Sequence, residues 1–366
     1  MKKIVFIMNT CQNPRCLKRI NEFMDNGYEV EVYGFSRKNA GAVLRSDRFT
    51  LNVIGEYSNE LGYLKRIPII VGALKRVFGR IKEPVIFYYF GYDIAFLSLT
   101  INRRAYIYEE SDLMHTYIRN AIVRNLLEYI DRKIINNSFE TIFTSEGFLK
   151  YHYGNKVPRN VSVIPNRLNK AILSKQPVGK KTEYPVKLKV GFVGVIRFKT
   201  VYEFVQTFLK NFPEHEFHFY GTDTSLDAKF ESLKSFGNVF FHGSFRNPDD
   251  LPEIYSNIDL VLATYDVSVL NVRYAEPNKI YEAVYFNTPI IVSKGTFLAE
   301  EVEQLGVGYW VNPSDAGDVV SLVDSILEKG FNDKTEACKS LPPEFSLNNN
   351  EGFFVKLNSK MNNKTG

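Results

Sequence analysis

Short apolar runs alternate along this chain with segments of helical periodicity, and that alternation limits the fold more than any other feature of the sequence. Such alternation is typical of βαβ units, in which a helix connects two parallel strands of one sheet. In the first half we predict strands at residues 3–8, 29–34, 85–89, 105–109, 141–144 and 161–164, with helices at 13–26, 93–101 and 118–136. In the second half we predict strands at residues 187–193, 216–220, 239–241, 260–263, 289–292 and 308–311. The sequence therefore predicts an α/β protein with two parallel sheets.

Length and composition agree with two domains. A chain of 366 residues exceeds what one hydrophobic core usually holds, and a hydrophobic content of 45% is enough for two cores. Residues 170–185 lie between the two groups of strands, are rich in Lys, Pro and Gly, and lack periodicity, which is typical of a linker. We therefore predict an N-terminal domain at 1–170, a linker at 171–187 and a C-terminal domain at 188–344.

The formal charge is unevenly distributed along the chain. Residues 1–170 hold 26 Lys and Arg against 16 Asp and Glu, a net charge of +10, whereas residues 171–366 hold 20 against 25, a net charge of −5. A basic half joined to an acidic half indicates that the first half faces an anionic surface. We do not expect that surface to be nucleic acid, because the sequence has no helix-turn-helix, zinc-finger or ribonucleoprotein motif.

The basic charge is densest at residues 64–82, where apolar residues at helical spacing alternate with Lys and Arg. The apolar set is Ile70, Leu74, Val77, Phe78 and Ile81, and the basic set is Lys75, Arg76, Arg80 and Lys82. This pattern predicts a helix that lies in the interface of an anionic membrane. An ordinary helix, packed on the core with a solvated basic face, is the alternative.

Cysteine count and hydropathy favour a cytoplasmic protein. The apolar run at the start of the sequence is only one strand long, which is too short for the apolar region of a signal peptide. No run approaches the roughly 20 apolar residues of a membrane span. The three cysteines are an odd number in a large chain, which suits reduced thiols better than a disulfide framework. We expect a cytoplasmic location, with peripheral binding to the inner face of the cytoplasmic membrane through the basic half.

Residues 276–293 form the most informative local segment, a helical pattern that runs directly into a buried strand. Pro277 suits the first position of a helix, so we expect the free N–H groups that follow it to point toward a bound phosphate. Helical spacing puts Asn278 and Glu282 together, on the face opposite the apolar residues. A surface helix with a solvated Glu282 is the alternative, because exposure is the commonest state of a Glu side chain.

This segment resembles the donor-site signature of the group 1 glycosyltransferases (family 4), in which a helix carrying Glu precedes a Gly-x-Pro-Val-Ile strand. Four further segments match the pattern of that family in the same order, at residues 190–199, 217–221, 239–243 and 251–262. The resemblance implies the GT-B fold, with two Rossmann-like domains facing a central cleft. It also implies a final helix that packs back on the N-terminal domain, and we place that helix at 345–362.

The resemblance further implies a reaction. A sugar would move from a nucleotide-sugar donor to a hydroxyl of a glycan acceptor, free or lipid-linked, in the synthesis of a surface polysaccharide such as capsule or lipopolysaccharide. Family membership would also imply that the anomeric configuration is retained and that the reaction needs no metal. The expected partners are therefore the donor, the glycan or lipid-linked glycan, and the anionic membrane surface.

The resemblance assigns the donor site to the C-terminal domain. The donor-binding residues that it implies are Gly194, Arg197, Lys199, Gly221, Gly243, Asn278, Lys279 and Glu282. Arg197 and Lys199 would bind the diphosphate, and Glu282 would bind the ribose. Gly194 would let the backbone approach the phosphates, where a Cβ would collide. The sequence departs from the family pattern at Tyr274, which stands where the family has its first Glu.

Carboxylates follow two of the strands predicted for the first domain. Asp93 comes after the strand at 85–89, and Glu110 and Asp112 come after the strand at 105–109. Clefts form at the carboxyl ends of parallel strands, so each of the three is a candidate for the catalytic base or for an anchor of the acceptor. Ser111 stands where the family has a His near the sugar.

Motifs for cofactors and metals are missing from the sequence. No Gly-x-Gly-x-x-Gly follows the first strand, which argues against a dinucleotide-dependent oxidoreductase, and there is no Walker A sequence. The sequence also lacks Asp-x-Asp, the metal clamp of the other main glycosyltransferase fold. We expect no cofactor and no metal, with protein cations and helix dipoles stabilising the leaving diphosphate. A GT-B sugar-nucleotide epimerase, or a catalytically inactive scaffold in a membrane synthesis complex, remain the alternatives.

Overall fold

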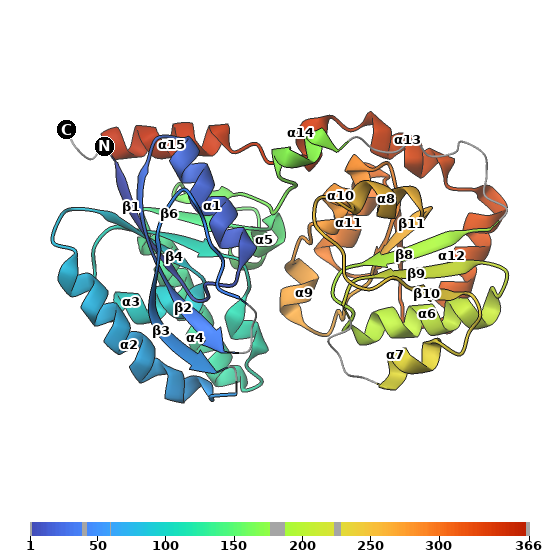
Figure 1. The fold of residues 1–366 in the computed structure, drawn as a ribbon, viewed down its shortest axis with the longest axis horizontal. Helices are drawn as coiled ribbons and strands as arrows, with labels where there is room; N and C mark the ends of the chain where they lie inside the picture. The colour runs from blue at the N-terminus through green and yellow to red at the C-terminus, as the bar shows by residue number, and fades with distance from the viewer. Residues whose placement is uncertain (1, 39–41, 59, 176–186, 223–227, 364–366) are drawn as a thin grey trace. The chain divides into compact units, whose positions relative to one another are not determined.

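The computed structural model describes residues 2–38, 42–58, 60–175, 187–222 and 228–363 (Figure 1). These residues form two compact units, and we describe each by itself. The first unit contains Met1–Pro165 and Asn350–Gly366, and the second contains Asn166–Asn349.

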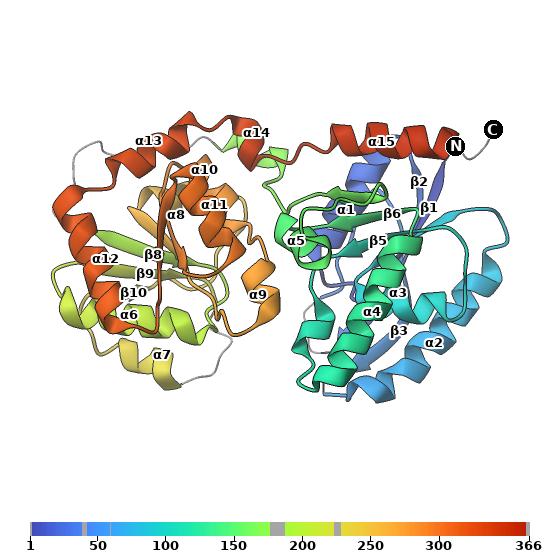
Figure 2. The same cartoon turned by 180° about the vertical axis from the view of Figure 1, so that it is seen from behind.

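In its described residues, the first unit is a seven-stranded parallel sheet with helices on both faces (Figures 1 and 2). Its strands are β1 (Lys3–Met8), β2 (Glu29–Lys38), β3 (Leu51–Ser58), β4 (Ile86–Phe90), β5 (Tyr106–Glu110), β6 (Glu140–Phe143) and β7 (Val161–Val163), in the order β3-β2-β1-β4-β5-β6-β7. Its helices are α1 (Pro14–Asp25), α2 (Tyr63–Arg80), α3 (Tyr92–Leu99), the 3-10 helix η1 (Met114–Tyr117), α4 (Ala121–Asn137), α5 (Glu146–Tyr153) and α15 (Glu351–Asn362). Helices α2, α3 and α4 lie on one face of the sheet, and α1 and α15 lie on the other.

Aromatic rings hold α1 and α15 against the first sheet. Phe23 of α1 packs edge-on against Phe6 of β1, with ring centroids 5.3 Å apart, and against Phe354 of α15, with centroids 5.1 Å apart. The ammonium group of Lys356 on α15 lies 2.6 Å from the carboxylate of Glu140 on β6. Helix α15 is therefore part of the core of the first unit, although it lies almost 190 residues beyond β7 in the sequence.

In its described residues, the second unit is a six-stranded parallel sheet (Figure 1). Its strands are β8 (Lys189–Val193), β9 (Glu216–Tyr220), β10 (Val239–Phe241), β11 (Leu260–Ala263), β12 (Ile290–Ser293) and β13 (Gly308–Val311), in the order β10-β9-β8-β11-β12-β13. Its helices are η2 (Lys170–Ser174), α6 (Lys199–Asn211), α7 (Ala228–Leu233), α8 (Leu251–Ser256), α9 (Leu270–Tyr274), α10 (Lys279–Tyr285), α11 (Phe297–Leu305), α12 (Ala316–Lys329), α13 (Asn332–Ser340) and α14 (Pro343–Ser346).

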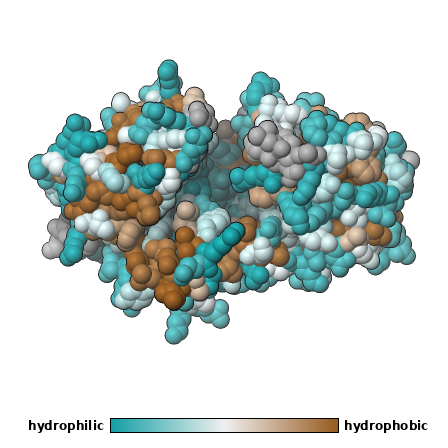
Figure 3. Space-filling view, turned by 90° about the horizontal axis from the view of Figure 1, so that it is seen from below, coloured by the Kyte–Doolittle hydropathy of each residue, from teal (hydrophilic) through white to brown (hydrophobic). Residues whose placement is uncertain are grey.

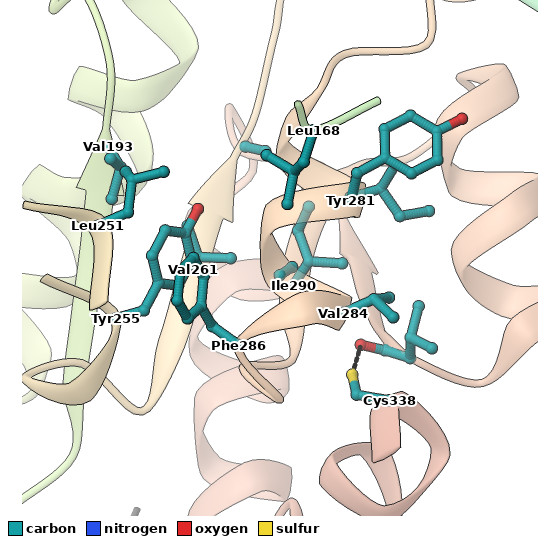
Figure 4. Close-up of a cluster of buried hydrophobic side chains, with 14 of the residues drawn as sticks. Leu168, Val193, Leu251, Tyr255, Val261, Tyr281, Val284, Phe286, Ile290 and Cys338 are labelled. Carbon is teal, nitrogen blue, oxygen red and sulfur yellow. Dashed lines mark hydrogen bonds between the residues drawn. The ribbon is translucent and has the colours of Figure 1, made fainter. Parts of the chain in front are cut away.

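Two hydrophobic clusters fill the second unit, and Figure 4 shows the one that packs α8 and α10 on the sheet. Tyr255 of α8 stacks on Phe286, with ring centroids 4.8 Å apart. Leu168 and Ile172 belong to the same cluster. Residues 166–175 therefore pack with the second unit, whereas the sequence places them in the first domain and the linker. The rest of the predicted linker, residues 176–186, lies outside the described residues.

The strands predicted from the sequence match the observed strands to within a few residues, but β3 is not predicted. Tyr57 is the one buried residue of β3, and the other residues of this strand are exposed or half-buried. β3 is the edge strand of the sheet, so it lacks the continuous apolar run by which the central strands are found.

Residues 64–82 form α2 largely as predicted, but the apolar residues of this helix face the core. Ile70, Leu74, Val77 and Phe78 are buried, and Phe78 packs edge-on against Phe87 of β4 with ring centroids 5.1 Å apart. These apolar side chains are therefore core residues and do not form a face that inserts into lipid. Binding of the exposed basic face of α2 to an anionic membrane stays a prediction. The alternative, a core-facing helix with a solvated basic face, holds. Among the described helices, none is long and apolar enough to cross a membrane.

Candidate functional site

The strand order of the second sheet reverses between β8 and β11, and crevices for ligands form at such points, beyond the carboxyl ends of the strands. The loop after β8 begins at Gly194 and runs into α6. The hydroxyl of Thr200, in the first turn of α6, donates a 3.2 Å hydrogen bond to the carbonyl of Thr264, which follows β11. This bond joins the two loops that border the crevice.

Three of the predicted donor-site glycines meet at this edge of the sheet. Gly194, Gly221 and Gly243 follow β8, β9 and β10, and their φ angles of +149°, +143° and +78° are rarely adopted by other residues. The Gly221 N–H donates a hydrogen bond to the Gly243 carbonyl, with a donor–acceptor distance of 2.7 Å. A Cβ on Gly221 would stand 1.7 Å from the Gly194 carbonyl oxygen. Glycine at 221 therefore lets the ends of β8 and β9 approach each other.

Arg197 and Lys199 lie at the start of α6 and are exposed. The guanidinium of Arg197 lies over the ring of Phe198, 5.0 Å from its centroid. Lys199 pairs with Glu203 at 2.6 Å, and this hydrogen bond raises the pKa of Lys199. No side chain caps the helix and its first turn has no acidic residue, so the terminal N–H groups and both cations can meet an anion.

Glu282 is a buried residue of α10, and its carboxylate is closed to solvent. It accepts hydrogen bonds from the hydroxyl of Tyr255 at 2.8 Å, from the ammonium of Lys279 at 2.5 Å and from the side-chain amide of Asn278 at 3.1 Å. Burial, followed by the charge of Glu282, raises the pKa of Tyr255 well above its usual range. The alternative of a solvated Glu282 is therefore wrong.

Helix α10 begins two residues later than the sequence predicts. Its first residue is Lys279 and Asn278 is the N-cap, so Pro277 precedes the helix and does not occupy its first turn. This start places Lys279 beside Gly194 at the carboxyl edge of the sheet, since a Cβ on Gly194 would stand 3.9 Å from Lys279 Cε. Glu282 holds Lys279 in this place, so Gly194, Asn278, Lys279 and Glu282 lie together. Arg197 and Lys199 contact Phe198 and Glu203 instead.

The corresponding switch point of the first sheet lies between β1 and β4. Asp93 is there, in the first turn of α3. Gly91 has φ +88°, and a Cβ on it would stand 3.4 Å from Asp93 Oδ1 and 3.5 Å from Asn9 Nδ2. Burial raises the pKa of Asp93, and the positive charges of Arg37 and Arg66 oppose that shift. Asp93 is therefore a carboxylate at a strand end with two cations close by.

Arg37 and Arg66 are residues that the sequence does not single out. Their guanidinium carbons lie 6.0 and 5.4 Å from the ring centroid of Tyr57, whose hydroxyl donates to the Asn9 carbonyl at 2.9 Å. Arg37 is the second-last residue of β2, and Arg66 is in the first turn of α2, which follows β3. Arg37 comes shortly after the strand predicted at 29–34, and this position is a signal that could have found it. Arg66 follows a strand that the sequence does not predict, so no such signal points to it.

Glu110 ends β5, but its side chain is fully buried. His152 Nε2 of α5 lies 3.1 Å from both of its carboxylate oxygens. Burial and the charge of Asp131 raise the pKa of Glu110 well above its usual range, and burial lowers the pKa of His152 to about 4. A carboxyl closed to solvent cannot contact a sugar, so Glu110 is withdrawn as a candidate base. Asp112, two residues later, is exposed.

In the part of the chain that the structure describes, Glu110, Asp131 and His152 form a group whose ligand atoms all lie within 4.8 Å of one another, close enough to hold a metal ion. His115 Nδ1 lies 3.3 Å from Asp131 Oδ2, and the Tyr108 hydroxyl donates to Asp131 Oδ1 at 3.1 Å. A proton held on Glu110 neutralises this group as well as a cation would, and the raised pKa of Glu110 agrees with the proton.

Comparison with known proteins gives a match at the level of family and of fold. Residues 174–340 match the family described as "Glycosyl transferases group 1". The succinoglycan biosynthesis protein ExoL of Rhizobium meliloti (strain 1021) is 20% identical over 369 residues, which cover 94% of this chain and 89% of that protein.

Solved structures of similar fold cover the whole chain. Sucrose-phosphate synthase from Thermosynechococcus elongatus has a TM-score of 0.71 at 15% identity, covering 100% of this chain and 99% of its own. Anabaena HepE, solved in complex with UDP and glucose, has a TM-score of 0.67 at 16% identity over the same shares. The lipopolysaccharide outer core galactosyltransferase WaaB, in its apo form, has a TM-score of 0.64 at 12% identity, covering 99% of each chain. At these identities the likeness establishes the fold alone.

Proposed function

We propose that this chain, whose residues 174–340 match the group 1 glycosyltransferases and whose fold is GT-B, moves a sugar from a nucleoside-diphosphate sugar to a hydroxyl of a lipid-linked glycan, with retention of configuration and without a metal. The proposal takes polysaccharide biosynthesis as its setting, as in the similar ExoL protein. One observation carries it: Glu282 and Tyr255 hold the ammonium of Lys279 under the backbone of Gly194.

The donor site of this proposal is the carboxyl edge of the second sheet. Departure of a nucleoside diphosphate develops negative charge on its phosphates, and preorganised donors that meet this charge lower the barrier. Lys279 is such a donor, because the buried ion pair with Glu282 fixes its ammonium before substrate arrives. Arg197 and the open N-terminus of α6 add charge and N–H groups at the neighbouring loop. HepE has been solved with UDP-glucose, which supports a uridine nucleotide as the first donor to test.

These same cations support a metal-independent reaction. Arg197, Lys199 and Lys279 are cationic donors near one strand edge, and charge-assisted hydrogen bonds from such donors can stabilise a diphosphate in place of a divalent ion. Lys199 also pairs with Glu203 and Lys279 with Glu282, so Arg197 brings the uncompensated charge. Glu282 is closed to solvent and turned toward Lys279, so it acts on the donor through Lys279. The ribose contact that the family resemblance implies would require this ion pair to open.

The acceptor would bind at the carboxyl edge of the first sheet. Asp93 has a raised pKa, and a carboxylate with a raised pKa is a better acceptor of the proton that the acceptor hydroxyl loses. Arg37 and Arg66 lie beside it and suit an anionic group of the acceptor, such as the phosphate of a lipid-linked glycan. Exposed Asp112 is the second candidate for the base.

The test is a transfer assay with the full chain, UDP-glucose and related donors, and membrane lipid extracts as the source of acceptor. We expect release of nucleoside diphosphate that depends on the extract, together with a labelled lipid-linked product. Turnover of the donor to an epimer without the extract would favour the epimerase alternative. A chain that binds none of the nucleotide sugars would favour the inactive scaffold.

A further inference from the structure

The N-terminal half of α4 is apolar, yet it buries no side chain completely. Ile122 is 82% exposed, Leu126 is 57% exposed and Tyr129 is 58% exposed. Positions 122, 126 and 129 follow the i, i+4, i+7 spacing, so their side chains share one face of the helix. The first buried residue of α4 is Asp131, almost three turns from its start. Single exposed apolar residues are ordinary, but a continuous helix face of them marks an interaction surface.

The same surface continues into the segment before the helix. Met114 and Tyr117 of η1 are 41% and 52% exposed, and Val123 is 44% exposed. We call the six residues Met114, Tyr117, Ile122, Val123, Leu126 and Tyr129 the α4 apolar face. The view from below in Figure 3 shows hydrophobic side chains gathered at this end of the first unit, where α4 begins in Figures 1 and 2.

The charge around the α4 apolar face is mainly basic. Residues 113–133 contain Arg119, Arg124, Arg132 and Lys133 against Glu128 and the buried Asp131, and Glu128 pairs with Arg132 at 2.8 Å. An anionic bilayer surface binds proteins through three kinds of side chain. Apolar side chains enter the acyl region, tyrosines lie at the headgroup level, and arginines pair with anionic headgroups. The net positive charge of residues 1–170 favours an anionic lipid surface over a protein partner for this face.

The α4 apolar face lies at the end of the sheet that carries the proposed acceptor site. In a parallel sheet, each connecting helix begins at the carboxyl edge, and α4 follows β5 through Asp112 and η1. Asp93 follows β4, the neighbouring strand, at the same edge. A membrane bound at this face would therefore be close to the end of the sheet where both candidate carboxylates lie.

We propose that the α4 apolar face inserts into the surface of a bilayer that contains anionic lipid, and that this docking brings the carboxyl edge of the first sheet to lipid-linked substrates. The insertion of the α4 apolar face is inferred from its exposure and the charge around it. The access to lipid-linked substrates that this docking would give rests on the proposed function. The helix at 64–82, expected from the sequence to make this contact, contributes only its solvated basic charge.

The experiment is co-sedimentation of the full chain with vesicles of phosphatidylglycerol and phosphatidylcholine in equal parts. The wild type binds these vesicles at low salt, and the Ile122→Glu/Leu126→Glu variant binds at least tenfold more weakly. Arg119→Gln/Arg124→Gln lowers the partition coefficient by about thirtyfold, since each cation contributes about fivefold at such a surface. Val355→Glu is the matched control, because Val355 is 70% exposed on α15 of the same unit, and it keeps the wild-type affinity.

Circular dichroism and the melting temperature show whether each variant folds as the wild type does. The proposal is overturned by a wild type that does not bind, by equal binding to pure phosphatidylcholine, or by an equal loss in the Val355→Glu control. It is also overturned if sedimentation shows a dimer that Ile122→Glu/Leu126→Glu converts to a monomer, since a second copy then covers the face. Vesicle binding is measured without donor, so a failed transfer assay leaves this result independent of the proposed function.

Discussion

The hydroxyl of Tyr255 donates a 2.8 Å hydrogen bond to the carboxylate of Glu282, and neither side chain is exposed to solvent. Lys279 pairs with the same carboxylate at 2.5 Å. A buried ion pair is costly to break, because removal of one partner leaves the other charge without compensation. Glu282 therefore has a structural role in the second unit that can be measured without any substrate.

The first prediction concerns that role. Glu282→Ala leaves the ammonium of Lys279 and the hydroxyl of Tyr255 without their partner, and we expect the free energy of unfolding to fall by about 3–5 kcal/mol. Exposed Glu328 of α12 is the matched control, and Glu328→Ala should change the free energy by less than about 0.5 kcal/mol. Urea unfolding of the two variants and the wild type checks this. Equal midpoints for the two variants would contradict the buried network.

The second prediction concerns the glycine edge. Gly221→Ala places a Cβ 1.7 Å from the Gly194 carbonyl oxygen and requires φ +143°, so the ends of β8 and β9 must separate. We expect a loss of about 2–4 kcal/mol in stability and a loss of nucleotide binding. Gly237→Ala is the control, since no atom lies within 4 Å of the added Cβ. If thermal unfolding finds Gly221→Ala as stable as Gly237→Ala, the close approach of the two strand ends is refuted.

The third prediction is a pH dependence with two opposing parts. Burial lowers the pKa of His152 from 6.5 to about 4, so between these values the unfolded chain binds a proton that the folded chain does not. Stability therefore falls as the pH falls from 6.5 to 4, and His152→Gln should flatten this part of the curve. Burial raises the pKa of Glu110, so the folded chain keeps a proton that the unfolded chain loses above about 4.5.

For Glu110 the sign is opposite, and stability falls as the pH rises above its unfolded pKa. Glu110→Gln keeps the hydrogen-bonding shape of the protonated carboxyl and should flatten this second part. Urea midpoints of wild type and both variants between pH 4 and pH 8 separate the two effects. Identical pH profiles for all three proteins would show that the network does not titrate as we describe. A stoichiometric metal in the purified chain would show that a cation holds the group together.

Much of the fold was predictable, because the central parallel strands are buried on both faces and so appear as apolar runs. The run at 3–8 matches β1 and the run at 260–263 matches β11, and nearly all side chains of both strands are buried. Edge strand β3 was missed, since it buries only Tyr57. The position of Glu110 at a strand end was also predictable. Its burial was not, because that depends on His152, which lies 42 residues away in the sequence.

The donor site was also predictable only in part. The cluster of Asn278, Lys279 and Glu282 follows from local helical spacing, and the glycines follow from the ends of predicted strands. Tyr255 could not be linked to Glu282 from the sequence, because α8 and α10 meet only through the packing of the sheet. That contact helps to bury Glu282, which in turn supports Lys279.

The fourth prediction concerns the acceptor. If Arg37 binds an anionic group beside Asp93, Arg37→Met should raise the KM for the acceptor about ten- to hundredfold, which is the worth of one charge-assisted hydrogen bond. The KM for the donor should not change. Exposed Arg80, at the end of α2, is the control, and Arg80→Met should leave both values unchanged. Steady-state kinetics with each substrate varied in turn decides between these outcomes, and a raised donor KM in Arg37→Met would contradict the assignment.

The central claim is that a nucleoside diphosphate binds, without metal, between Gly194, Arg197 and Lys279. Titration calorimetry of UDP into the full chain, with and without a chelator, tests it most directly. We expect the same affinity in both conditions, and about ten- to hundredfold weaker binding by Arg197→Ala and by the charge-balanced Lys279→Met/Glu282→Gln variant. Loss of binding on chelation, or unchanged affinity in both variants, would contradict the account.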